Sequence, residues 1–125
     1  ALSVPLAFGL AWLIDKGLRA VIFSPRPSAD LVAVASASSS SGLPSTFGLV
    51  YGSIFGMVVF PAASGRSALG LRAVALALII IGAAARVVLG GHWTSQMVAS
   101  VLLGLLAAAA ASEVANRLLM KEGAR

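Results

Sequence analysis

Four apolar stretches divide this chain. They cover residues 2–23, 44–60, 69–89 and 93–119, with charged and polar residues gathered near their ends. Each stretch holds roughly 18 to 25 residues, enough at about 1.5 Å per residue to cross a hydrocarbon core about 30 Å thick. The pattern predicts an all-α membrane protein, a bundle of about four transmembrane helices that forms a single domain over residues 1–125.

Composition supports a membrane protein and narrows its chemistry. Of the 125 residues, 59% are hydrophobic and only 10% are charged, with a mean hydropathy of +1.00, whereas a soluble domain needs more polar surface. The chain has no cysteine, one histidine and four acidic residues, too few for a recognisable metal cluster. Its net charge is +5, but the cations form no basic stripe with interleaved aromatic residues, so nucleic-acid binding is not expected.

The segment between the first two stretches predicts an extramembrane loop over residues 24–43. Pro25 and Pro27 end the first stretch, because proline disfavours helix in the residue before it. The loop contains a serine-rich run at 36–41, and an apolar turn is expected at 31–34. The chain begins inside an apolar run with no basic region before it, so we expect a protein whose N-terminal spans are missing here.

Small residues mark the helix faces that are expected to pack. Gly48, Gly52 and Gly56 recur every four residues, which permits a neighbouring helix to approach closely. Ser45 lies three residues before Gly48 and is expected to point the same way, toward the interior of the bundle. A second row with the same spacing starts at His92 and continues as Gln96, Ser100, Gly104, Ala108 and Ser112.

Alternating helix directions would bring distant residues to one membrane surface. That surface receives Arg19, Arg26, Ser45, Arg86, His92 and Gln96. The three arginines repel one another unless an anion lies among them, and the planar guanidinium group suits phosphate oxygens. The helix start at Ser45 adds backbone N–H groups that favour the same anion. The sequence therefore predicts a phosphate site.

His92 is the only histidine, and two interpretations of it stay open at this point. A neutral imidazole in line with a bound phosphoryl group can attack phosphorus, while arginines stabilise charge on the equatorial oxygens. Alternatively, His92 is a hydrogen-bonded interfacial residue next to Trp93, whose ring suits the headgroup zone.

Three motifs resemble the type 2 phosphatidic acid phosphatase superfamily, membrane enzymes related to vanadium haloperoxidases. The first motif is a basic residue, six residues and Arg-Pro, which here runs from Arg19 to Arg26-Pro27. The second is Pro-Ser-Gly-His, which here reads Pro44-Ser45-Thr46-Phe47. The third is Ser-Arg, five residues, His, three residues and Asp, which here reads Ala85-Arg86, His92 and Gln96. The resemblance covers almost the whole chain and implies the last four of six spans.

The resemblance also implies a role for each matching residue. Phosphate would be bound by the side chains of Arg19, Arg26, Ser45, Thr46 and Arg86. His92 would be the nucleophile that forms a phosphohistidine, and Gln96 would orient it from the position of the family's aspartate. The implied substrates are lipid phosphates and diphosphates, such as phosphatidic acid or a polyprenyl diphosphate, and no metal or other cofactor is implied.

Two departures from the family bear on catalysis. The family's proton-donating histidine is Phe47 here, and its aspartate is Gln96, which adds no charge. Losing a general acid typically costs about 10²- to 10⁴-fold in rate. Three alternatives follow: a substrate with a good leaving group, a weakened relative that binds lipid phosphate without efficient turnover, or residues introduced to trap a complex. Because the nucleophile and every expected phosphate ligand remain, an enzyme is the leading interpretation.

Charges at the two membrane surfaces predict an orientation. At the surface with the phosphate site, Asp15 and Arg19 are four residues apart and are expected to form a helical ion pair. The other surface carries Arg66, Arg72, Arg117, Lys121 and Arg125. Because basic residues favour the cytoplasmic side, the phosphate site is expected to open outward, to the periplasm or exterior of a bacterial inner membrane.

Overall fold

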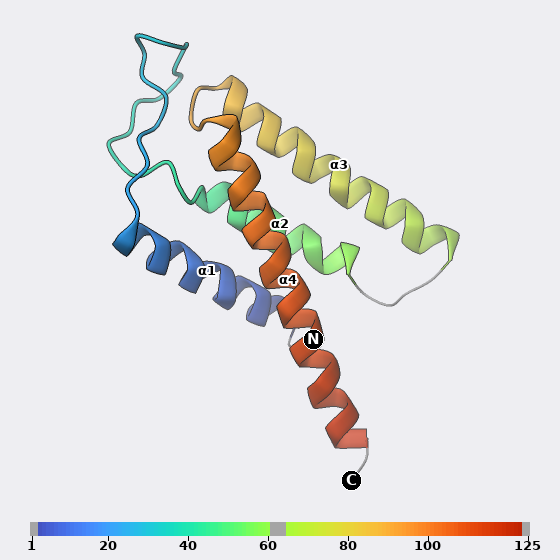
Figure 1. The fold of residues 1–125 in the computed structure, drawn as a ribbon. Helices are drawn as coiled ribbons and strands as arrows, with labels where there is room; N and C mark the ends of the chain where they lie inside the picture. Colours follow the sequence, from blue (N-terminus) through green and yellow to red (C-terminus); the bar gives the residue numbers. More distant parts are fainter. Residues whose placement is uncertain (1–2, 61–64, 124–125) are drawn as a thin grey trace.

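The computed structural model describes residues 3–60 and 65–123, and helices are the only regular secondary structure in these residues. The helices are α1 (Ser3–Val21), α2 (Thr46–Val59), α3 (Arg66–Val88) and α4 (Thr94–Gly123) (Figure 1). The predicted all-α fold with four helices is confirmed. Arg125, one of the basic residues used to predict the orientation, lies outside the described residues.

The four helices differ in length, which corrects the prediction that each apolar stretch is long enough to cross a hydrocarbon core. α2 has 14 residues, so at about 1.5 Å per residue it is about 21 Å long, less than a hydrocarbon core. α1 has 19 residues, but Asp15, Lys16 and Arg19 lie in its second half. Only α3 and α4, among the described helices, are long and apolar enough to cross a membrane by length and composition. Their most apolar windows are 11% and 33% buried, unlike the core helices of a soluble protein.

α4 crosses α2 at very short range along the glycine face predicted from the sequence. A Cβ atom built on Gly48 would lie 2.8 Å from Cβ of Ser100, and one on Gly56 would lie 2.7 Å from Cβ of Ala108. At Gly52 a Cβ atom would lie 2.5 Å from the carbonyl oxygen of Val101. The expected small-residue packing is confirmed, and the crossing holds the start of α2 beside the start of α4 (Figure 1).

The other two helices pack around this crossing. α1 lies against α4 and α2, and Ala11, Leu49 and Ala107 form a small buried cluster there. α3 meets α2 at Gly82, where a Cβ atom would lie 2.9 Å from the ring of Tyr51. α3 joins α4 through a short turn at one end and diverges from it beyond that turn (Figure 1). A groove of about 440 Å³ lies between these two helices, lined by Ile79, Ala83, Val87, Met97 and Val101 among others.

The segment 22–45 has no helix, as predicted for residues 24–43, and it covers the end of the bundle where the four helices meet (Figure 1). A turn is present but begins earlier than the predicted 31–34, because the N–H groups of Leu31 and Val32 both donate to the carbonyl of Ser28. The N–H of Ala35 donates to the carbonyl of Leu89, which ties the segment to the turn between α3 and α4. The loop is therefore held at the end of the bundle where α3 turns into α4.

The crossing of α2 and α4 predicts a strong position dependence of glycine substitutions. Gly52→Ala should lower the free energy of unfolding by about 1–3 kcal/mol, because the new methyl group meets backbone atoms of α4 that cannot move aside. Gly70→Ala on α3 is the matched control: its Cβ has nothing within 4 Å, so stability should be unchanged or rise by up to about 1 kcal/mol. Thermal unfolding in detergent measures both, and equal effects would contradict the crossing.

Candidate active site

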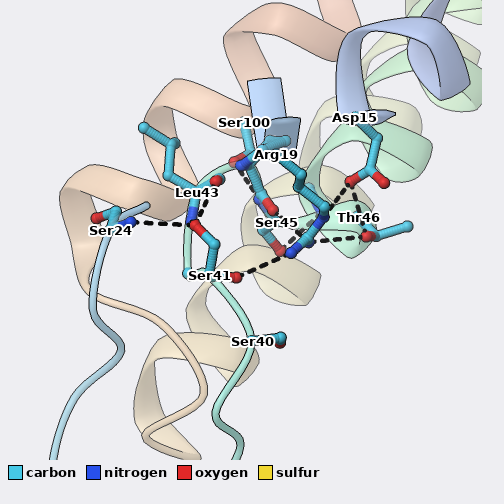
Figure 2. Close-up of polar contacts among 12 residues, drawn as sticks. Asp15, Arg19, Ser24, Ser40, Ser41, Leu43, Ser45, Thr46 and Ser100 are labelled. Atoms are coloured by element: carbon cyan, nitrogen blue, oxygen red, sulfur yellow. Dashed lines mark hydrogen bonds and ion pairs between the residues drawn. The ribbon is translucent and has the colours of Figure 1, made fainter. Parts of the chain in front are cut away.

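Arg19, in the last turn of α1, joins that helix to the start of α2 (Figure 2). Its Nε donates to Oδ1 of Asp15 at 3.0 Å, which confirms the predicted ion pair. Its other nitrogens donate to the carbonyls of Ser41 and Pro44 at 3.0 and 2.7 Å, and to Oγ1 of Thr46 at 3.2 Å. The Thr46 hydroxyl donates in turn to Asp15, which is only 6% exposed. The Asp15 carboxylate thus holds both Arg19 and Thr46 in place.

Ser45 is the N-cap residue of α2 and is fully buried. Its hydroxyl accepts the N–H of Gly48 at 3.3 Å, and its own N–H donates to the Ser100 hydroxyl at 2.7 Å (Figure 2). Ser100 donates to the carbonyl of Gln96 one turn earlier in α4. Ser45 therefore caps α2 and links it to α4, and the inward direction predicted for its side chain is confirmed.

Arg26, in the loop, reaches the turn between α3 and α4. Its NH1 group donates to the carbonyl of Gly91 at 2.8 Å and lies 3.1 Å from Nε2 of His92. Its remaining donors contact the Ser40 carbonyl and hydroxyl and, at 3.3 Å, the Ser41 carbonyl. Burial, followed by the charges of Arg19 and Arg86, lowers the pKa of Arg26 from its ordinary value.

His92 lies in the turn just before α4 and is 3% exposed. Its Nδ1 is 2.8 Å from the carbonyl oxygen of Gly42, which can only accept a hydrogen bond. Its Nε2 faces Arg26, whose guanidinium can only donate. These two partners specify the neutral tautomer with the proton on Nδ1 and the lone pair on Nε2. Burial is the main cause that lowers the pKa of His92, and the charges of Arg26, Arg86 and Arg19 lower it further against the opposing Gly42 hydrogen bond.

Arg86, in the last turn of α3, differs from the other two arginines. Its guanidinium lies over the ring of Phe47, 5.3 Å from the centroid, and Phe47 stacks on Tyr51 at 4.1 Å. Its Nε is buried and has no hydrogen-bond partner among the residues that the structure describes. A buried unpaired donor is costly, so this nitrogen is the one most ready to bind an added anion. Phe47, where the resemblance places the family's acid, supports Arg86 instead.

Gln96 lies in the first turn of α4 and is 5% exposed. Its Oε1 accepts the N–H of Trp93 at 3.0 Å, and its Nε2 donates to the Ser24 hydroxyl and the Pro25 carbonyl, each at 2.8 Å. These bonds hold the loop, whereas Nδ1 of His92 is held by Gly42. A direct hold of Gln96 on the imidazole, as the resemblance implies, stays a prediction.

The structure brings together residues that the sequence spacing placed at one surface. Arg26 contacts His92, Arg86 covers Phe47, and Arg19 contacts Thr46. Sequence reasoning missed the backbone carbonyls of Ser40, Ser41, Gly42 and Gly91, which accept five hydrogen bonds from the side chains of Arg19, Arg26 and His92. Every residue has a carbonyl, so no side-chain pattern could have identified them.

The PAP2 superfamily model matches residues 1–119. The chain belongs to the PAP2 superfamily. This confirms the resemblance drawn from the three motifs, and members of the PAP2 superfamily are generally phosphatases that act on phosphorylated, lipid-like substrates. Searches of the curated proteins and of the solved structures gave no match. Within residues 3–60 and 65–123, no three His, Cys, Asp or Glu side chains are grouped to hold a metal ion.

The lowered pKa of His92 is testable because the PAP2 chain has a single histidine. In ¹⁵N-labelled protein without phosphate, the imidazole should titrate below its ordinary pKa of 6.5, so more than half of it should be neutral at pH 6.5. Inorganic phosphate should raise this pKa, because the anion offsets the arginine charges that oppose protonation. NMR titration in detergent measures both values.

Two variants test the origin of that pKa. Arg86→Gln should raise the pKa of His92, because one of the charges that lower it is removed. Arg117→Gln is the control, since Arg117 is an exposed residue of α4 paired with Glu113. A wild-type pKa at or above 6.5, or equal pKa values in the two variants, would contradict this account of the site.

Proposed function

We propose that this PAP2 chain is a metal-independent membrane lipid phosphatase that acts through a phosphohistidine. The observation that supports it most is the state of His92: a neutral imidazole with its lone pair on Nε2, beside Arg26, and with Arg19 and Arg86 close enough to lower its pKa. Neutral imidazole nitrogen is the nucleophile that phosphoryl transfer needs, and arginine donors can stabilise the charge on the transferred group.

In the proposed first step, the lone pair of His92 Nε2 attacks phosphorus while the bond from phosphorus to the leaving oxygen breaks. The electron pair of that bond goes to the leaving oxygen. The Nδ1 proton stays on the ring, and the Gly42 carbonyl stabilises the positive imidazole. Arg26 must transfer its NH1 hydrogen bond from Nε2 to a phosphate oxygen, which frees the lone pair for attack. Water then attacks phosphorus in the phosphohistidine, the electron pair of the P–N bond returns to Nε2, and the proton of the attacking water leaves with the phosphate product or passes to solvent.

Phe47 bears on which leaving group the proposed reaction can release. A phenyl ring donates no proton, so an alkoxide leaving group would have to take its proton from water. A lipid diphosphate avoids this need, because cleavage between its phosphates releases a lipid monophosphate, which is stable as an anion. We therefore place a polyprenyl-type diphosphate ahead of a monoester of the phosphatidic acid type.

The groove between α3 and α4 suits the hydrocarbon chain of such a substrate. Its lining is apolar apart from Thr94. Two lining residues are close to the site in sequence: Val87 directly follows Arg86, and Thr94 lies two residues after His92. A phosphate bound at the arginines would thus leave its lipid chain at the mouth of the groove. α3 also exposes Leu69, Leu71, Val74, Ile80 and Ile81, an apolar surface suited to membrane lipid.

The proposed setting is a bacterial inner membrane with the site facing the periplasm or exterior. Arg66 and Arg72 lie at the start of α3, and Arg117 and Lys121 lie in the second half of α4, at the ends of these helices away from His92. Because basic residues favour the cytoplasmic side, the loop and the phosphate site would lie on the other side.

A second candidate function is lipid-phosphate binding without efficient turnover. Phe47 cannot donate a proton, and Arg26 donates to the lone pair of His92 Nε2 that the enzyme reaction would need. This alternative predicts that the protein binds lipid phosphate with no phosphate release, and that Arg86→Ala weakens the binding.

The purified protein should release phosphate from a polyprenyl diphosphate in detergent with a metal chelator present. His92→Ala should lower the rate by about 10³-fold or more, because no other group replaces the nucleophile. Phosphate release measures the rate, and acid-labile phosphate on the protein, present in wild type and lost in His92→Ala, reports the intermediate.

Ser95→Ala is the control: Ser95 is exposed and lies in the first turn of α4, three residues after His92, so this variant should keep full activity. Equal inactivity of wild type and His92→Ala on mono- and diphosphates would reject the enzyme. Retained binding of those lipids, weakened in Arg86→Ala, would then support the binding protein.

Phe47→His should separate the two substrate types. With a proton donor restored, hydrolysis of a lipid monophosphate should rise by about 10²-fold, and that of a diphosphate by less than about tenfold. Because Phe47 also supports Arg86, Phe47→Leu is the control that removes the ring without adding an acid. If Phe47→His and Phe47→Leu hydrolyse the lipid monophosphate at the same rate, proton donation does not limit the reaction at this site.

A further inference from the structure

The amide of Gln96 holds two neighbouring residues of the loop. Its Nε2 donates to the Ser24 hydroxyl and to the Pro25 carbonyl, each at 2.8 Å. Its Oε1 accepts the N–H of Trp93, the residue just before α4, at 3.0 Å, as a glutamine in the first helical turn does in a capping box. Both donor hydrogens and the oxygen of one buried side chain are therefore engaged.

The first loop residue leads to Nδ1 of His92. The Ser24 carbonyl accepts the N–H of Gly42 at 2.7 Å, and the Gly42 carbonyl accepts Nδ1–H of His92 at 2.8 Å. Gly42 also lies directly against Gln96, since a Cβ atom on Gly42 would be 2.5 Å from both Nε2 and Oε1 of the amide. The position of the Gly42 carbonyl is thus fixed on two sides by Gln96 and its partner Ser24.

The second loop residue leads to Nε2 of His92. Pro25 is followed by Arg26, whose NH1 lies 3.1 Å from Nε2. Holding the Pro25 carbonyl restricts where the Arg26 backbone can lie. One amide on α4 consequently fixes the loop residues that contact both imidazole nitrogens, although its own hydrogen bonds reach neither nitrogen.

We propose that Gln96 is a positioning residue that sets the tautomer and direction of His92 through the loop, by way of Gly42 and Arg26. This inference deepens the proposed function and rests on it for its rate effects. Two donor hydrogens are essential to the role. An aspartate here would be one methylene shorter and acceptor-only, so it could not donate to the Pro25 carbonyl.

The experiment compares Gln96→Asp, Gln96→Glu and the control Ser95→Ala. Gln96→Glu keeps the side-chain length and an acceptor for the Trp93 N–H but loses both donations. Both variants at Gln96 should lower kcat by about 10- to 100-fold, because a misplaced nucleophile is costly even when its chemistry is intact. Ser95→Ala should leave kcat unchanged.

The ¹⁵N shifts of the neutral imidazole give a readout that needs no turnover. Wild type and Ser95→Ala should show the Nδ1–H tautomer, whereas Gln96→Glu should show a mixture of the two tautomers. A folding defect alone would be recognised by a lowered Tm, so circular dichroism melts accompany each variant. Gln96→Asn provides a second test, because this shorter amide keeps its two donor hydrogens and should recover part of the tautomer preference.

A rise of kcat in Gln96→Asp would overturn the inference, because it would mean that a carboxylate at this position acts on the imidazole directly. An unchanged tautomer in Gln96→Glu would overturn it as well. Inactive wild type with the expected tautomer changes would instead reject the proposed function and leave the positioning role supported.

Discussion

The close crossing of α2 and α4 is the contact on which the rest of the structure depends. Three glycines of α2 bring its backbone against α4, and this places the N-cap Ser45 within hydrogen-bond distance of Ser100. The starts of α2 and α4 are thereby held in a fixed position relative to each other. The loop that follows α1 bonds to Gln96 of α4 and to the turn that follows α3, and its Arg26 lies 3.1 Å from Nε2 of His92.

Three arginines near one end of the bundle repel one another, and backbone carbonyls accept many of their hydrogen bonds. Arg19 and Arg26 donate to the oxygens of Ser40, Ser41, Pro44 and Gly91, and Asp15 neutralises one of the charges. Carbonyl dipoles satisfy the donors without cancelling the net positive charge, so the site still attracts an anion. Arg86, with a buried Nε that has no described partner, keeps donor capacity for it.

The two departures from the family pattern acquire different meanings in the structure. Phe47 packs between Tyr51 and Arg86, so its ring orders the guanidinium that we propose as a phosphate ligand, at the position where the resemblance places the family's acid. Gln96 bonds to the loop, so the hydrogen bond that orients His92 comes from a backbone carbonyl. A carbonyl orients an imidazole without adding a full charge, so in the proposed reaction only the Gly42 carbonyl and other dipoles would stabilise a positively charged imidazole.

The sequence by itself determined the helices, the α2 face that packs and the side chains that gather at one end, because apolar periodicity, glycine spacing and motif spacing are properties of side chains. The predicted stretch 44–60 is slightly longer than α2, because its end residues Ser45 and Phe60 cap the helix without belonging to it. Only the tertiary structure decided which atoms hold His92. Those atoms are the Gly42 carbonyl and the Arg26 guanidinium, carried by a loop whose path depends on long-range hydrogen bonds to Gln96. Backbone acceptors are identical in every residue, so their selection requires the fold.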